Sequence, residues 1–210
     1  MQKWLPYDLR REKRWFRMKI HMILFEDFET LDLFGPVEIL ARVKEHELVY
    51  ESLNGGIVES AQGTKIVTSR FEQADSDSVL VIPGGRGTRT LVEDESFLNG
   101  ISGLVSKAGY VLSICTGSAL LAKAGVLTGR KATSNKKAWE WVMSVSDQVD
   151  WIRHARWVKD GKFYTSSGVS AGMDMALGFV SDVYGVQKAE QIADDIEYLW
   201  NRDMDSDPFA

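Results

Sequence analysis

The chain has 210 residues and a net charge of −5, with 44% hydrophobic and 10% aromatic residues. This length suits one α/β domain with a sizeable core. The acidic balance argues against a general nucleic-acid binder, and no apolar run is long enough for a membrane span, so we expect neither nucleic acid nor a membrane among the partners. A single cysteine excludes an internal disulfide and favours a reducing, cytoplasmic setting.

Residues 1–17 differ from the rest of the chain, because they carry six basic and two acidic side chains together with four aromatic ones. They lack the apolar core of a signal peptide. We treat them as a basic N-terminal extension and residues 18–210 as a single domain. Two alternatives stay open: either Met18 is the original start and the extension is dispensable, or the extension is an ordered arm packed on the domain or on a second subunit.

Strands and helices are predicted to alternate along the domain. Apolar runs predict strands over residues 19–25, 47–52, 78–82, 110–114 and 129–133. Helical spacing predicts helices over residues 32–43, 93–107, 118–125, 136–145, 170–184 and 186–201, with Ser170 as a cap. Turn signals predict two hairpins, one pairing 57–59 with 65–68 and the other pairing 151–159 with 162–166. This alternation is typical of a mostly parallel sheet with helices on both faces.

Cys115, the only cysteine, falls where a predicted strand changes directly into a predicted helix. No loop residues separate the two elements, and Gly117 permits a sharp turn. This arrangement is the nucleophile elbow of serine hydrolases. We expect the helix N-terminus to favour the thiolate form of Cys115. A lone cysteine is otherwise a small buried core residue, so the elbow is what favours a catalytic nucleophile.

Ligands of parallel α/β sheets bind at the carboxyl ends of the strands. Four turns or loops are predicted at that edge: residues 29–32, 84–87, 115–117 and 166–170. The last of them contains Ser167 and Gly168, which we expect in the same pocket. The backbone N–H groups of Gly85 and Thr116 are candidates for an oxyanion hole. The glycines at 84–87 lack the spacing of a phosphate-binding loop.

A nucleophilic cysteine needs a group that transfers protons. Asp32 and Glu29 both follow the first strand at the expected edge, and burial beside a thiolate would raise the pKa of either carboxyl toward neutrality. Asp32 has a competing role as a helix N-cap, and the choice between the two acids stays open on this basis. His154 is expected as a structural residue within a strand. We predict no metal site and no cofactor, because the histidines are scattered.

Five segments taken together resemble the ThiJ/PfpI superfamily. They are LDLFGP at 31–36, IPGG at 82–85, SICTGS at 113–118, GVLTGRKAT at 125–133 and TSSGVSAGMD at 165–174. The resemblance covers about residues 18–201 and is strongest to the isonitrile hydratase branch. It implies a class I glutamine amidotransferase-like, flavodoxin-like three-layer sandwich, and a homodimer. It also implies Cys115 as nucleophile, Asp32 as general acid/base and Thr116 as a site residue.

The chain departs from the family pattern at two places. Protease-like members place a histidine directly after the cysteine, whereas Thr116 stands here, so we expect no protease activity. Hydratase-like members commonly have Thr-His-Trp where this chain has Ser134, Asn135 and Lys136. Asn135 cannot titrate, although it can hydrogen-bond a ligand.

Three functions follow from these observations. The first is a cysteine-dependent small-molecule hydratase or hydrolase that resembles isonitrile hydratase and yields an N-substituted formamide. The second is glyoxalase or deglycase chemistry on reactive aldehydes, with Glu29 as the base. The third is a non-enzymatic redox sensor whose Cys115 oxidises to a sulfinic acid.

Overall fold

The protein is described by a computed structural model over residues 18–210, and the predicted extension at 1–17 lies outside the described residues. One sheet of eight strands organises this part of the chain. In spatial order the strands are β3 (Gly56–Glu59), β4 (Lys65–Arg70), β2 (His46–Ser52), β1 (Met18–Ile23), β5 (Val79–Ile82), β6 (Tyr110–Ile114), β10 (Phe163–Ser166) and β9 (Trp157–Asp160). All pairs from β4 to β10 are parallel, while β3 and β9 pair antiparallel at the two edges.

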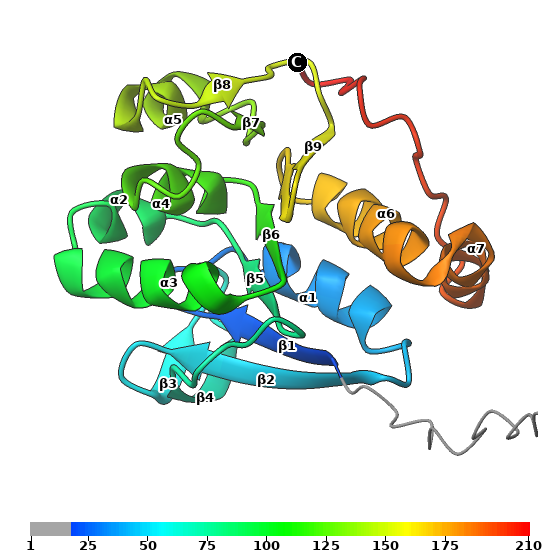
Figure 1. Cartoon of the computed structure of the whole chain (residues 1–210), viewed down its shortest axis with the longest axis horizontal. Helices are drawn as coiled ribbons and strands as arrows, with labels where there is room; N and C mark the ends of the chain where they lie inside the picture. The colour runs from blue at the N-terminus through cyan, green and yellow to red at the C-terminus, as the bar shows by residue number, and fades with distance from the viewer. Residues whose placement is uncertain (1–17) are drawn as a thin grey trace, which may run out of the picture.

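Helices cover both faces of this sheet (Figure 1). They are α1 (Thr30–Leu40), α2 (Thr88–Leu91), α3 (Glu95–Lys107), α4 (Gly117–Lys123), α5 (Trp139–Val145), α6 (Ala171–Tyr184) and α7 (Val186–Asp195). Helices α1, α6 and α7 pack together on one face, and α2, α3 and α4 pack on the other. The two short strands β7 (Lys131–Ala132) and β8 (Asp150–Trp151) form a separate parallel pair. The predicted three-layer α/β fold with a mostly parallel sheet is therefore confirmed.

The central strands form because they can be buried on both faces. All four residues of β5 are buried, and Val81 is in register with Met22 on one side and Leu112 on the other. Continuous apolar runs of this kind are typical of parallel strands. The order β2-β1-β5-β6-β10 is flavodoxin-like, and it reverses between β1 and β5. Open α/β sheets bind ligands outside the strand ends at such a reversal.

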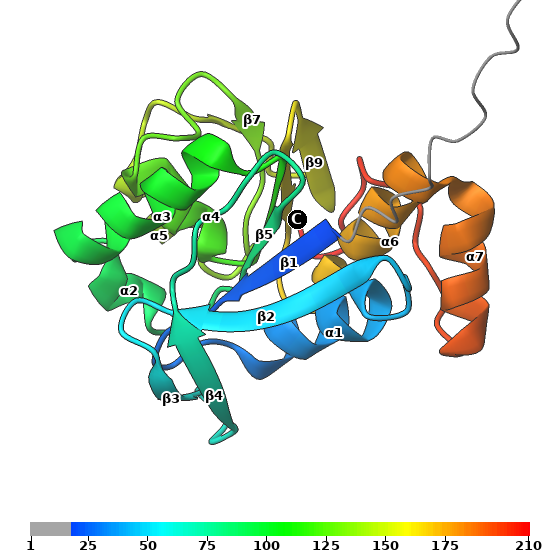
Figure 2. The ribbon, with the colours of Figure 1, turned by 60° about the horizontal axis from the view of Figure 1, so that its bottom comes forward.

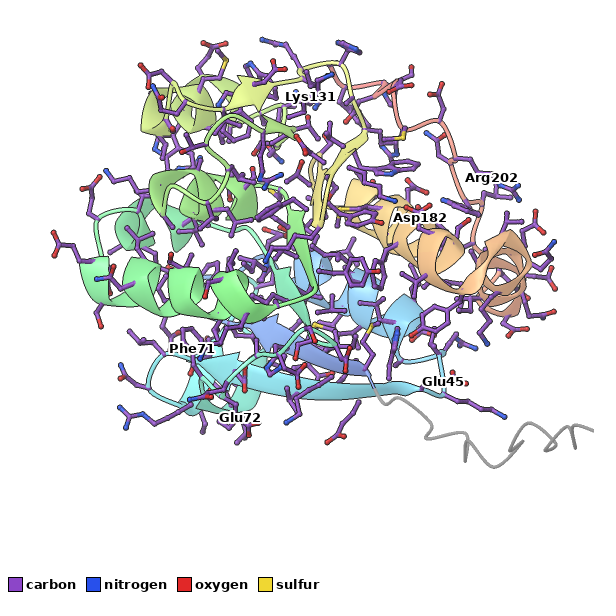
Figure 3. All side chains as sticks on the ribbon, viewed as in Figure 1. Glu45, Phe71, Glu72, Lys131, Asp182 and Arg202 are labelled. Carbon is purple, nitrogen blue, oxygen red and sulfur yellow. The ribbon has the colours of Figure 1, made fainter. Side chains whose placement is uncertain are left out.

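Many charged side chains are exposed, among them Lys131, Asp182 and Arg202 (Figure 3). The predicted hairpin of β3 and β4 is confirmed, and it projects from one edge of the sheet (Figure 2). No helix within residues 18–210 combines the length and apolar character that crossing a bilayer would require.

The second predicted hairpin is shorter than expected. Trp151 belongs to β8, a turn follows, and β9 begins only at Trp157, so His154 lies in a turn and its predicted place in a strand is wrong. The backbone of this stretch bonds the C-terminal segment instead of a neighbouring strand: the Arg156 N–H donates to the Met204 carbonyl at 2.8 Å, and the His154 carbonyl accepts from the Asp207 N–H at 2.8 Å. The buried Arg156 guanidinium also pairs with Asp174 on α6 at 2.6 Å.

The last helix ends at Asp195, although apolar spacing predicted it to continue to residue 201. Glu197 adopts a positive φ of 52°, which stops the helix. The following residues then bond Asp174: its Oδ1 accepts from the Tyr198 hydroxyl at 3.0 Å and from the Asn201 backbone N–H at 2.9 Å. A buried carboxylate thus redirects the chain end.

Two smaller predictions also fail. Ser170 precedes α6, but its side chain makes no capping hydrogen bond, because its backbone is already helical (φ −71°, ψ −25°). Helix α2 was not predicted, since its four residues are too few to give an amphipathic pattern.

Gly117 is where the strand-to-helix junction is packed most tightly. A Cβ at this position would lie 2.6 Å from the Ile82 carbonyl oxygen and 2.7 Å from that of Pro83. Both contacts are with backbone, which cannot move aside without disturbing β5. The glycine therefore lets α4 begin directly against the end of the neighbouring strand.

We predict that Gly117→Ala lowers the free energy of unfolding by about 1–3 kcal/mol, because the added methyl group overpacks the junction. Gly103→Ala is the matched control: Gly103 is exposed within α3, and a Cβ there meets nothing within 4 Å. That control should raise the stability by about 0.5–1 kcal/mol through helix propensity. Urea denaturation of both variants measures the two effects. Equal stability of the two variants would contradict the tight-junction argument.

Candidate functional site

Cys115 occupies a strained turn between β6 and α4. Its φ is 56°, in the left-handed region that residues other than glycine rarely adopt. Neighbouring groups hold this conformation: the Cys115 N–H donates to the carbonyl oxygens of Ser166 and Ser167 at 3.2 Å each. The Cys115 carbonyl accepts from the hydroxyls of Ser118 and Ser134 at 3.2 and 2.8 Å. The strand-turn-helix geometry predicted for the elbow is therefore present.

Gly84 joins the elbow to the turn that follows β1. Its N–H donates to Asp32 Oδ2 at 2.9 Å, and its carbonyl accepts from the Glu29 N–H at 2.8 Å. A Cβ on Gly84 would lie 2.5 Å from the Thr116 nitrogen and 2.9 Å from the Cys115 Cβ. Only a glycine allows this approach, and it brings the turns after β1, β5 and β6 into contact.

Asp32 lies in the first turn of α1 and is fully buried. Its second oxygen, Oδ1, has no hydrogen-bond partner among the described residues. Burial raises the pKa of Asp32 to about 7, and the negative charge of Glu29 raises it further, while the Gly84 hydrogen bond and the Cys115 side chain oppose the change. A carboxyl group with this pKa can both accept and donate a proton near neutral pH.

The expected preference of Cys115 for the thiolate is wrong for this structure. Only 6% of the residue is exposed, and burial raises the pKa of its thiol, as does the nearby Asp32 carboxylate. Hydrogen bonds from Thr116 and Asn135 act in the opposite direction but are outweighed. Burial therefore raises the pKa of both groups, and Asp32 is the stronger acid of the two.

The hydroxyl of Thr116 is bonded within the turns. Its Oγ1 accepts from the Gly85 N–H and from the Thr88 hydroxyl, both at 3.1 Å. The Gly85 N–H is thus engaged and does not point freely at a reacting atom. The Thr116 N–H instead acts on Cys115, because it lowers the pKa of the thiol. The oxyanion-hole role predicted for both N–H groups stays a prediction, with Thr116 the better placed donor.

A cavity of about 310 Å³ opens over Cys115. It is lined by Glu29, Gly85, Arg86, Arg89, Cys115, Thr116, Asn135, Lys137, Ala138 and Val169. A second cavity of about 240 Å³ shares Asn135, Lys137 and Val169 with the first and extends to Ser167, Gly168 and Phe209. The structure therefore brings candidate residues from the four predicted turns to one place. Asp32 is buried behind them and reaches the site through its bond to the Gly84 N–H.

Comparison with known proteins agrees with this geometry. The model of the DJ-1/PfpI family matches residues 18–182. The chain belongs to the DJ-1/PfpI family. An isonitrile hydratase of Pseudomonas putida is 33% identical over 192 residues, covering 86% of this chain and 78% of the relative. A deglycase of Thermococcus kodakarensis is 32% identical over 154 residues, covering 71% of this chain and 89% of the relative.

A solved structure shows the same fold over nearly the whole chain. The crystal structure of a ThiJ/PfpI family protein from Pseudomonas syringae superposes with a TM-score of 0.78 at 25% identity, covering 97% of this chain and 83% of that one. The predicted resemblance to the ThiJ/PfpI superfamily is confirmed.

The two acids of this DJ-1/PfpI domain occupy different positions. Glu29 lies at the rim of the cavity, is half-buried and accepts a hydrogen bond from Gln62 Nε2 at 3.0 Å. Asp32 is the acid that interacts with Cys115. Asp32 is also not the N-cap of α1, since Glu29 occupies that position without a capping side-chain bond. No group of three or more His, Cys, Asp or Glu side chains in residues 18–210 is arranged to hold a metal ion.

Asn135 bridges the two cavities. Its Oδ1 accepts from the Ala138 N–H at 3.0 Å, which fixes the orientation of the amide. A Cβ on Gly168 would overlap Asn135 Nδ2, so Gly168 leaves room for this amide. The amide lies close enough to Cys115 to lower the pKa of the thiol, an effect that the sequence did not predict.

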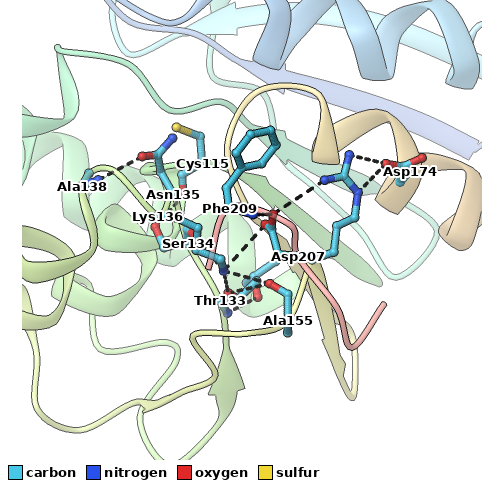
Figure 4. Close-up of polar contacts among 12 residues, drawn as sticks. Cys115, Thr133, Ser134, Asn135, Lys136, Ala138, Ala155, Asp174, Asp207 and Phe209 are labelled. Carbon is cyan, nitrogen blue, oxygen red and sulfur yellow. Dashed lines mark hydrogen bonds and ion pairs between the residues drawn. The ribbon is translucent and has the colours of Figure 1, made fainter. Parts of the chain in front are cut away.

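The C-terminal segment contributes residues that the sequence did not indicate. Asp207 is buried, and its Oδ1 accepts from the Phe209 N–H at 3.0 Å (Figure 4). Its carboxylate lies 3.9 Å from Arg156 Nη1 and 4.0 Å from Lys136 Nζ. This anchoring places Phe209 against the second cavity. No signal could have found it, because the pairing depends on where the chain returns after α7.

We predict that Asp32 gives the protein a distinctive pH dependence of stability. Its folded pKa of about 7 lies above its ordinary value of 3.8, so its favourable contribution is complete below pH 3.8 and is lost as the pH rises through 7. Relative to Asp32→Asn, the wild type should lose up to about 4 kcal/mol of unfolding free energy over this range. Chemical denaturation at several pH values measures the difference.

Glu29→Gln is the control, since that acid reaches solvent at the rim. If the difference between wild type and Asp32→Asn were constant from pH 4 to 8, the raised pKa of Asp32 would be wrong.

Proposed function

We propose that the protein is a cysteine-dependent hydratase of isonitriles. The observation that carries the proposal is the buried pair of Cys115 and Asp32, in which the carboxyl has a pKa of about 7 and one oxygen without a partner among the described residues. Addition of a thiol to an isonitrile requires a proton to move from sulfur to carbon. A carboxyl beside the thiol, with a pKa near neutrality, is suited to that transfer.

The reaction follows from this arrangement in two stages. In the first, Asp32 accepts the thiol proton while the Cys115 sulfur bonds the terminal carbon of the isonitrile, and the same proton then passes to that carbon. The product is a covalent thioimidate. In the second, water adds to its carbon–nitrogen double bond, the nitrogen takes up a proton, and the carbon–sulfur bond breaks. An N-substituted formamide leaves, the thiol regains its proton, and the net change is addition of one water.

The cavities supply the other requirements of the reaction. The Thr116 N–H is the group best placed to hold developing negative charge, and Asn135 lowers the pKa of the thiol. The second cavity, bounded by Val169 and Phe209, offers room for the substituent on nitrogen. The relative from Pseudomonas putida supports the proposal, being named as an isonitrile hydratase and similar over most of the chain. A homodimer, which the family resemblance implies, stays a prediction.

A deglycase-type reaction is the alternative, since relatives named as deglycases also match. It would require Glu29 as the base. Glu29 lies at the rim and bonds Gln62, whereas Asp32 interacts with the sulfur. A redox sensor is less well supported, because the raised pKa of a 6%-exposed thiol slows the thiolate oxidation on which sensing depends.

We expect hydration of simple isonitriles to be lost in Cys115→Ser and to fall by a factor of about 10²–10⁴ in Asp32→Asn, because proton transfer by a positioned acid is worth that much. Glu29→Gln is the matched control and should retain most of the activity. Formamide release is followed by chromatography or by infrared absorption of the isonitrile. Full isonitrile turnover by Asp32→Asn would contradict the proposed mechanism. Turnover of a 2-oxoaldehyde that is lost in Glu29→Gln but not in Asp32→Asn would favour the deglycase alternative.

A further inference from the structure

Three cations line the cavity over Cys115, and a single acid stands with them at its rim. Arg86, Arg89 and Lys137 all contribute to the wall, and none of them has an ion-pair partner within residues 18–210. Glu29 is the acid, and it is occupied by Gln62. The opening above the sulfur is therefore positively charged.

Arg89 is the cation that the fold holds in place. Its guanidinium lies 3.6 Å from the centroid of the Trp141 ring, which α5 supplies, and its Nη1 donates to the Thr88 hydroxyl at 3.3 Å. Stacking fixes the plane of the group, so less conformational entropy is lost when a ligand binds. Burial lowers the pKa of Arg89, and the negative charge of a Cys115 thiolate acts in the opposite direction, so the guanidinium lies within electrostatic reach of the sulfur.

We propose that the substrate carries a carboxylate and that Arg89 binds it while the reacting carbon meets Cys115. A planar guanidinium offers the paired donors that a carboxylate accepts, and Lys137 and Arg86 add attraction without fixed geometry. The proposal rests on the proposed function, because the substrate class that it names is isonitriles with an acidic substituent. The apolar side of the site, at Val169 and Phe209, then accommodates the remainder of the molecule.

The cations could instead serve only to stabilise a thiolate. The two roles separate in the alkylation of Cys115, which is the only cysteine and gives no background. In both reagents the sulfur displaces iodide and forms one carbon–sulfur bond, but iodoacetate carries a carboxylate and iodoacetamide does not. The measured quantity is the ratio of the two rate constants, because a general effect on the thiol cancels from it.

We expect Arg89→Met to lower the iodoacetate-to-iodoacetamide ratio by about fivefold or more, since one nearby charge is lost. Arg42→Met is the control: Arg42 is exposed after α1, pairs with Glu38 and lies outside the cavity. The iodoacetate-to-iodoacetamide ratio of Arg42→Met should equal that of the wild type. An unchanged ratio in Arg89→Met, with both reagents slowed alike, would overturn the proposal. Failure of both reagents to reach the native thiol would also overturn it.

A second measurement separates this proposal from the proposed reaction. An isocyano carboxylate and its neutral amide are compared as substrates of wild type, Arg89→Met and Arg89→Lys. We expect KM for the acid to rise about tenfold in Arg89→Met, as for loss of a charged hydrogen bond, with partial recovery in Arg89→Lys and no change for the amide. Equal effects on both substrates would reject the carboxylate site and keep the hydratase. Charge-selective alkylation without turnover of either substrate would reject the hydratase and keep the carboxylate site.

Discussion

The contact between the Cys115 thiol and the Asp32 carboxyl is the interaction on which the site depends. Each group is buried, and burial is the main reason that the pKa of each is raised. The Asp32 carboxylate raises the pKa of the thiol further, whereas the Cys115 side chain acts on the Asp32 pKa in the opposite direction. Burying an acid costs stability, and the protein offsets only part of this cost through the Gly84 hydrogen bond. That uncompensated cost is why the pKa of Asp32 is raised to about 7.

The fold produces this contact by bringing three strand ends to the place where the strand order reverses. β1 leads to Asp32, β5 leads to Gly84, and β6 leads to Cys115. Gly84 and Gly117 let the backbones approach more closely than any side chain would permit. The strained φ of Cys115 is held by hydrogen bonds to both its N–H and its carbonyl. Strain at the nucleophile is thus sustained by neighbouring elements, as at other functional sites.

The sequence predicted the parts of the structure that depend on local pattern. The alternating elements, the elbow at Cys115 and the edge at which Asp32 lies all follow from periodicity and turn residues. It failed where the chain bonds distant groups. After α7 ends, Tyr198 and Asn201 bond Asp174. The backbone of His154 and Arg156 bonds the C-terminal segment where a strand was predicted. The ionisation of Cys115 was also mispredicted, because a helix N-terminus is visible in sequence whereas the depth of burial is not.

The site has a buried part and a solvent-exposed rim, and the cost of placing a charge differs between them. At depth, Asp32 and Cys115 are buried, so a charge on either group is costly. At the rim, Arg89 stacks on Trp141 and keeps its charge in contact with solvent. A negative group bound at the rim would keep its contact with solvent and so avoid the desolvation cost that raises the pKa of Asp32. The uncharged reacting carbon can enter the buried part of the site without such a cost. The arrangement therefore suits a substrate that is charged at one end and neutral at the other, and it orients that substrate before any bond forms.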